Sequence, residues 1–61
     1  MDDKTTIQNS YASVLDNLFK QLFDGFTESA GSAPMEAQVL ASFTSGLAIA
    51  RRARDAAIAA L

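Results

Sequence analysis

The apolar residues in the first half of the chain recur every three or four positions, the spacing of one helix face. At 100° per residue they fall within an arc of about 180°, and polar residues fill the opposite side. These apolar positions are Ile7, Tyr11, Val14, Leu15, Leu18, Phe19, Leu22, Phe23 and Phe26. The pattern therefore predicts a strongly amphipathic helix over about residues 6–29.

Local signals suggest where this helix begins and ends. Thr5 and Gln8 have the spacing of a capping box, in which a threonine hydroxyl and a glutamine side chain satisfy free amides at the first turn. Phe26 continues the apolar stripe, so we place the end of the helix near Ser29. Gly31 then supplies the left-handed residue that commonly follows a helix.

The only clear break in the chain is the Gly-Ser-Ala-Pro sequence at 31–34. Ser32 is a suitable N-cap, Pro34 is tolerated in a first helical turn, and Glu36 complements the helix dipole. A second apolar face follows, formed by Met35, Val39, Leu40, Phe43, Gly46, Leu47, Ala50, Ala53, Ala57, Ile58 and Leu61. These features predict a turn over about 30–34 and a second helix over about 35–60.

Two long helices joined by a short connection predict an all-α fold, an antiparallel two-helix hairpin that forms a single domain over residues 1–61. Two helices alone cannot shield an apolar arc of 180°. A single core of this size rarely yields more than ~3–5 kcal/mol of stability. We therefore expect the hairpin to be completed by self-association, most simply as a dimer that resembles a four-helix bundle.

Large apolar side chains on both helices are the candidate interface. They are Tyr11, Leu15, Leu18, Phe19, Leu22, Phe23, Phe26, Leu40, Phe43, Leu47 and Ile58. Several of them have the i, i+3/i+4, i+7 spacing with which a helix anchors itself in an apolar groove. The sequence thus indicates a small protein–protein interaction module, such as an oligomeric adaptor, assembly factor or chaperone-like protein. Its expected partners are further copies of itself and another protein.

A second interpretation is a subunit of a helical filament or of a secretion-type assembly. Such an assembly needs two different contact surfaces on each copy, because heterologous contacts do not close. Ile49 lies outside the main apolar arc of the second helix and is the one hint of a second surface.

Arg51, Arg52 and Arg54 form the one dense basic cluster, in which Arg51 and Arg54 are candidates for polar contacts. Arg54 falls in the middle of the apolar arc, where an unpaired charge is costly. It either finds a partner or extends over the end of the bundle with its head group in water. Candidate partners near the start of the first helix are Asp2, Asp3 and the Tyr11 hydroxyl, besides a carboxylate of another copy.

Nucleic-acid and membrane-surface binding are both disfavoured. The pI is about 4.6, no aromatic residue stands among the arginines, and Asp55 is directly beside them. Helices that lie on membranes usually carry Lys or Arg on the polar face. The first helix instead carries Asp16, Asp24 and Glu28 against Lys20.

The chain has no His, Cys or Trp, so it offers no thiolate and no side chain that ordinarily titrates near neutral pH. Its carboxylates follow a polar face with nothing to raise their pKa, which makes them poor general acids. We find no phosphate loop, nucleophile–base pair or metal-ligand cluster, and expect neither enzymatic activity nor a cofactor. The start of the chain does not resemble a signal peptide, and the longest uncharged stretch has 14 residues, so a cytoplasmic protein is expected.

Overall fold

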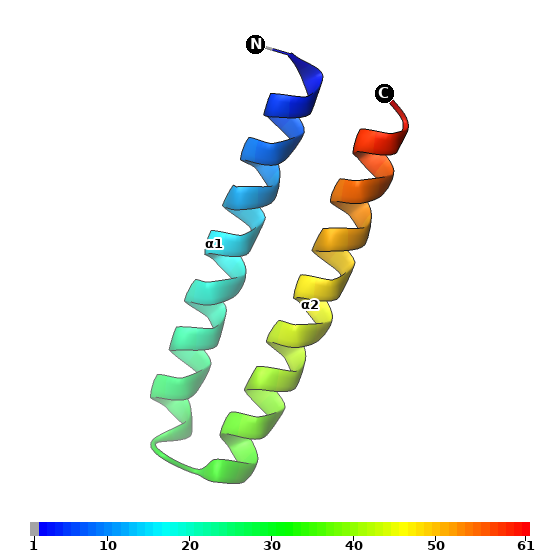
Figure 1. Ribbon diagram of the computed structural model, residues 1–61. Helices are drawn as coiled ribbons and strands as arrows, with labels where there is room; N and C mark the ends of the chain where they lie inside the picture. The colour runs from blue at the N-terminus through cyan, green and yellow to red at the C-terminus, as the bar shows by residue number, and fades with distance from the viewer. Residues whose placement is uncertain (1) are drawn as a thin grey trace.

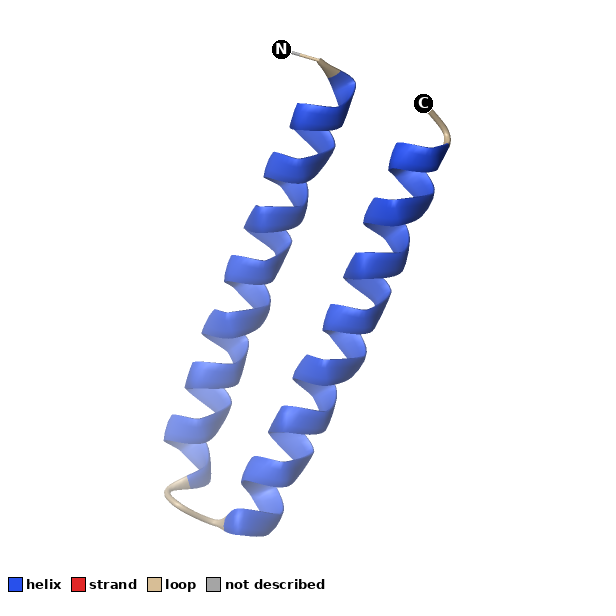
Figure 2. Cartoon of the chain, viewed as in Figure 1, coloured by secondary structure: helices blue, strands red, loops and turns tan. Residues whose placement is uncertain are grey.

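The computed structural model describes residues 2–61, which form two helices packed side by side in opposite directions (Figures 1 and 2). Helix α1 spans Asp3–Ser29 and helix α2 spans Ala33–Ala59. The Cα atoms extend over 44 × 18 × 7 Å, so the hairpin is a single flat layer. The predicted all-α hairpin is confirmed. Both chain termini lie at one end, called the open end below, and the connection lies at the turn end.

Helix α1 begins earlier than the sequence pattern suggests, and the predicted capping box at Thr5 and Gln8 is wrong. Asp2 is the N-cap: its backbone is extended, and its carboxylate accepts a hydrogen bond of 2.7 Å from the Thr5 amide. Aspartate caps a helix at least as well as threonine, and its negative charge also complements the helix dipole. Thr5 is therefore a helical residue that donates to the cap.

The turn reverses the chain over residues 30–32, with two successive residues at positive φ. Gly31 has a φ of 82°, but the left-handed backbone already begins at Ala30, where φ is 50°. Ser29, the only buried residue among 2–61, donates its hydroxyl to the Gly25 carbonyl at 2.7 Å. The end predicted near Ser29 is correct, and the left-handed cap comes one residue sooner than expected.

Helix α2 starts two residues before its predicted position. Ser32 occupies the N-cap with Pro34 and Glu36 in the first turn, as the sequence suggests, although the Ser32 hydroxyl makes no capping bond. The Ser32 carbonyl accepts the first helical bond, 2.9 Å from the Glu36 amide. The helix ends at Ala59, one residue short of the expected end.

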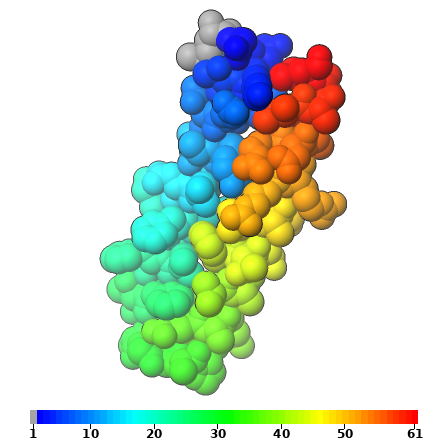
Figure 3. All heavy atoms as spheres, in the orientation of Figure 1, coloured from blue at the N-terminus to red at the C-terminus, as the bar shows by residue number. Residues whose placement is uncertain are grey.

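The two helices meet along one seam of half-buried residues that recur at alternating spacings of three and four, the pattern of a coiled coil (Figure 3). On α1 the seam contains Tyr11, Leu15, Leu18, Leu22, Gly25 and Ser29. It continues through Ser32, the N-cap of α2, and on α2 it contains Glu36, Val39, Phe43, Gly46 and Ala50. None of the apolar residues between 2 and 61 is buried in the hairpin.

Two glycines set the distance between the helices. A Cβ atom added to Gly46 would lie 2.8 Å from Leu18 Cδ2, and one added to Gly25 would overlap Val39 Cγ1. Real Cβ atoms do not approach that closely without a shift of the neighbour. The same contacts give the register, in which Gly25 lies opposite Val39 and Leu18 opposite Gly46.

We expect Gly46→Leu to lower the free energy of unfolding by about 1–3 kcal/mol, because overpacking a close contact costs that much. Urea denaturation followed by circular dichroism, at one fixed protein concentration, measures the change. Ala48→Leu is the matched control, since Ala48 is exposed on α2. If Gly46→Leu stabilised the protein instead, helix propensity would outweigh the contact with Leu18.

The Asp2 cap predicts a pH dependence at the start of α1. The hydrogen bonds from Thr5 lower the pKa of the Asp2 carboxyl. A lowered pKa means that the stabilisation is complete above the ordinary aspartate value of about 3.9 and is lost as the pH falls through the lowered pKa. The protection factor of the Thr5 amide in hydrogen exchange should therefore fall over this interval.

Two variants separate the charge from the hydrogen bond. Asp2→Asn keeps a capping oxygen without a titrating group, so protection of the Thr5 amide should persist in acid. Asp2→Ala should reduce that protection at every pH. Full protection of the Thr5 amide in Asp2→Ala would contradict the assigned cap.

Candidate functional site

Among residues 2–61, eight large apolar side chains remain exposed, and most of them gather on two surfaces. The exposed set is Val14, Phe19, Phe23, Phe26, Met35, Leu40, Ile49 and Leu61. Monomeric proteins rarely expose contiguous apolar surface of more than a few hundred Å² unless it binds something. The two surfaces are therefore the candidate functional sites.

The first surface, called the phenylalanine patch, consists of Phe19, Phe23 and Phe26 of α1 with Leu40 of α2. The three phenylalanines are 57%, 63% and 38% exposed. Their spacing of four and three places them on one flank of the α1 seam. Viewed from the N-terminus of each helix, Leu40 lies on the same side of the α2 seam as the phenylalanines do of the α1 seam. Because the helices run in opposite directions, this places Leu40 on the same face of the hairpin as the three rings. The patch lies toward the turn end.

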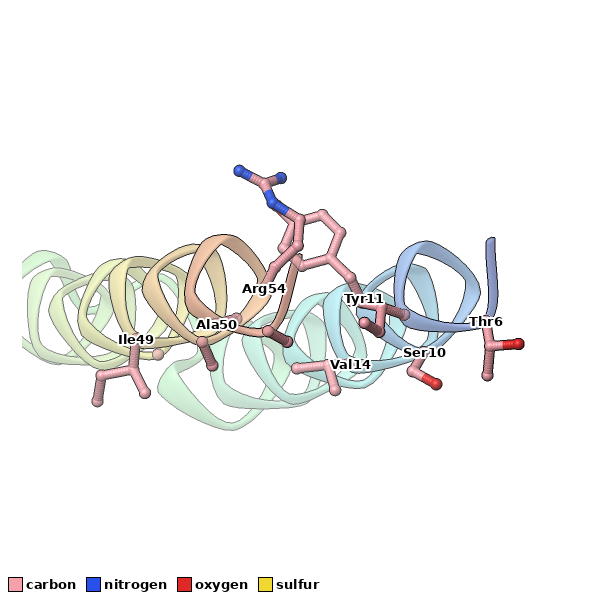
Figure 4. Close-up of a pocket in the computed structure, with 11 residues that line it drawn as sticks. Thr6, Ser10, Tyr11, Val14, Ile49, Ala50 and Arg54 are labelled. Atoms are coloured by element: carbon pink, nitrogen blue, oxygen red, sulfur yellow. The ribbon is translucent and has the colours of Figure 1, made fainter. Parts of the chain in front are cut away.

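The second surface, called the open-end groove, is a hollow of about 500 Å³ between the first half of α1 and the second half of α2 (Figure 4). It is lined by Thr6, Ile7, Ser10, Tyr11, Val14, Gly46, Ile49, Ala50, Ala53, Arg54 and Ala57. Four of the α2 residues that line it are glycine or alanine, and their small size leaves the space open. Val14 and Ile49 point the same way as Ala50 in Figure 4 and are 45% and 63% exposed.

The two surfaces lie on opposite faces of the hairpin. Val14 and Phe19 are five residues apart, which places them about 140° apart around α1. Leu40 and Ile49 are nine residues apart, which places them about 180° apart around α2. The surfaces also lie toward opposite ends, since the groove is near the chain termini and the patch is near the turn.

Arg54 is held by two neighbours that turn its head group out of the groove. Its guanidinium carbon lies 4.5 Å from the centroid of the Tyr11 ring, and its Nε atom is 2.9 Å from Asp55 Oδ1. The hydrogen bond that Arg54 donates to the Asp55 carboxylate is the main cause of the raised pKa of Arg54. Figure 4 shows the Tyr11 and Arg54 side chains projecting away from Thr6 and Val14. Of the partners expected from the sequence, Tyr11 is present through its ring face, and Asp55 was not anticipated.

The other charged groups between 2 and 61 are exposed, except Glu36 in the seam. Asp16 and Lys20 form an i, i+4 ion pair, with 2.9 Å between Oδ2 and Nζ, and the hydrogen bond to Asp16 raises the pKa of Lys20. Within residues 2–61, Arg51 and Arg52 are exposed and make no ion pair. That part of the chain also contains no group of three or more acidic, His or Cys side chains arranged to hold a metal ion. Neither helix is long and apolar enough to cross a membrane.

The structure divides the residues predicted for the interface into two sets. Half-buried residues take up positions at or beside the seam; they are Tyr11, Leu15, Leu18, Leu22, Phe43, Leu47 and Ile58. Phe19, Phe23, Phe26 and Leu40 remain exposed in the phenylalanine patch. Sequence reasoning missed the open-end groove, for which the position of Ile49 outside the main arc was the only signal.

Comparison with protein-family models, with curated proteins and with solved structures finds no match to this chain. Function is therefore inferred from the surfaces themselves.

The contact between Tyr11 and Arg54 is testable by a pair of substitutions. Tyr11→Phe keeps an aromatic ring beneath the guanidinium and should retain the thermal midpoint, whereas Tyr11→Leu removes the ring and should lower it. The difference between the two variants should disappear in an Arg54→Met background, measured as a double-mutant cycle. An equal difference in both backgrounds would mean that the ring contributes through packing alone.

Proposed function

We propose that this chain is a non-enzymatic protein–protein interaction module that self-associates through the phenylalanine patch. One observation carries the proposal: three phenylalanines on one flank of α1 are each more than a third exposed, in a hairpin with no buried apolar residue between 2 and 61. A helix pair that leaves large apolar side chains in water gains free energy when association buries them.

The size of the exposed surface supports this interpretation. With about 200 Å² for each phenylalanine side chain, the three exposed fractions leave about 300 Å² of aromatic surface in water. At 25 cal/mol per Å², covering that surface is worth at most about 8 kcal/mol for each copy, before the entropy lost on association is subtracted. The core of a domain this small rarely supplies more than ~3–5 kcal/mol, so covering the patch is a large driving force relative to the stability of the isolated hairpin.

Self-association fits two kinds of role. A closed dimer of two hairpins makes a four-helix bundle, which suits a small adaptor, assembly factor or chaperone-like protein that then binds another protein. A subunit of an open filament is the second candidate. The observation that favours it is the open-end groove, which gives each copy a second apolar surface on the opposite face.

Phe23→Ala should weaken association, because it removes the most exposed ring of the patch. Light scattering over a concentration series should give a mass of at least twice 6.5 kDa for the original chain and a mass near 6.5 kDa for the variant at low concentration. Two salt concentrations should give the same result, since contacts between apolar groups are not screened.

Met35→Ala is the matched control, because Met35 is a 50% exposed apolar residue outside both surfaces. It should associate like the original chain. A well-folded original chain that keeps a mass of 6.5 kDa at every concentration would refute self-association. A loss of association in Met35→Ala as well would refute the assignment to the patch.

A further inference from the structure

We infer that the open-end groove of one copy receives the phenylalanine patch of the next copy, so that the contact is heterologous and does not close on itself. The inference rests on the proposed self-association and identifies the occupant of the groove. It follows from the juxtaposition of a protruding aromatic surface and an apolar hollow on opposite faces of one small chain.

The two surfaces are complementary in shape. Phe19, Phe23 and Phe26 stand out from the helix surface, whereas the groove is a hollow of about 500 Å³. A cavity of about 150 Å³ holds one benzene ring, so the groove has room for about three phenyl groups. The patch supplies three. Two patches that face each other would instead bring two protruding surfaces together.

The chemistry of the groove also suits an aromatic guest. Ile49, Val14 and the alanines of α2 present hydrocarbon, and Thr6 and Ser10 contribute only small hydroxyl side chains. Arg54 is the one charged residue of the lining, and its head group is held outside by Tyr11 and Asp55. A phenyl ring would therefore enter without desolvating the Arg54 guanidinium. Desolvation of a charged group is the main cost of burying an apolar group beside it.

The apolar surface that each arrangement leaves in water points the same way. The three rings of the patch expose about 300 Å². The groove exposes a second apolar surface on the opposite face. A heterologous contact uses the patch of one copy and the groove of the next, so each interior copy covers both of its apolar surfaces. A closed pair joined by patch alone leaves two grooves in water.

The placement of the surfaces then determines the form of the assembly. Because patch and groove lie on opposite faces, a third copy can join the free face of the second. Because they lie toward opposite ends, successive copies are displaced along the hairpin axis. Contacts of this kind build a staggered, open array unless a rotation happens to close it.

A complementation experiment tests the contact. The groove-filled variant is Ala53→Trp, at an exposed position in the lining, and the patch-deficient variant carries Phe19→Ala with Phe23→Ala. Each variant alone lacks one half of the contact and should have a mass near 6.5 kDa. Mixed in equal amounts, they should form a complex of about twice that mass and no larger. The original chain should grow in mass with concentration.

Matched variants show that these effects are local. Ala48→Trp adds the same side chain to an exposed position outside the groove and should associate like the original chain. Ala53→Glu places a charge in the groove instead of a large side chain, and it replaces Ala53→Trp if that variant disturbs the fold. Circular dichroism reports the helix content of each variant.

Other outcomes separate this inference from the proposed function. If Ala53→Trp and Ala53→Glu still form dimers, and mixing produces no new complex, the patch pairs with itself. That result overturns the inference and leaves self-association intact. If the original chain is a monomer at every concentration, both proposals are wrong.

Discussion

The structure depends on one geometric constraint: each helix has a single neighbour and can touch it along only one line. The seam closes tightly where Gly25 meets Val39 and where Gly46 meets Leu18. A seam of one line shields only a narrow strip of each helix. The apolar arc of α1 is much wider than that strip, so the hairpin forms while no apolar residue between 2 and 61 becomes buried.

The excess width of the arc appears as two separate surfaces because the seam runs through its middle. Phe19 and its neighbours fall on one side, and Val14 falls on the other. The composition of α2 then makes them different in kind. Small residues opposite Val14 leave a hollow, while larger side chains opposite the phenylalanines fill the seam and let the rings protrude. One chain thus carries a convex and a concave apolar surface.

Periodicity was enough to predict two helices, and the short connection between them was enough to predict their antiparallel pairing. The width of the apolar arc was enough to predict that one neighbouring helix would leave part of it uncovered. Two kinds of feature were harder to predict: those in which two residues compete for one role, and those that depend on how the two helices pack against each other. Asp2 and Thr5 are both competent N-caps, and only the backbone conformation shows which one acts. The open-end groove needs the register of one helix against the other, which spacing within either helix does not give. Tyr11 was among the candidate partners of Arg54, but the contact through its ring face depends on how the two helices pack.

The turn has a further consequence that concerns chirality. Ala30 and Gly31 both adopt positive φ, yet only glycine does so without strain, and an L-residue there costs roughly 1–2 kcal/mol. The connection therefore requires left-handed backbone at two successive positions, and only Gly31 adopts it without strain. A D-alanine at position 30 would take this backbone as its natural conformation and leave the conformational freedom of the unfolded chain unchanged. The handedness of a single α-carbon thus offers a way to strengthen the hairpin without altering either apolar surface.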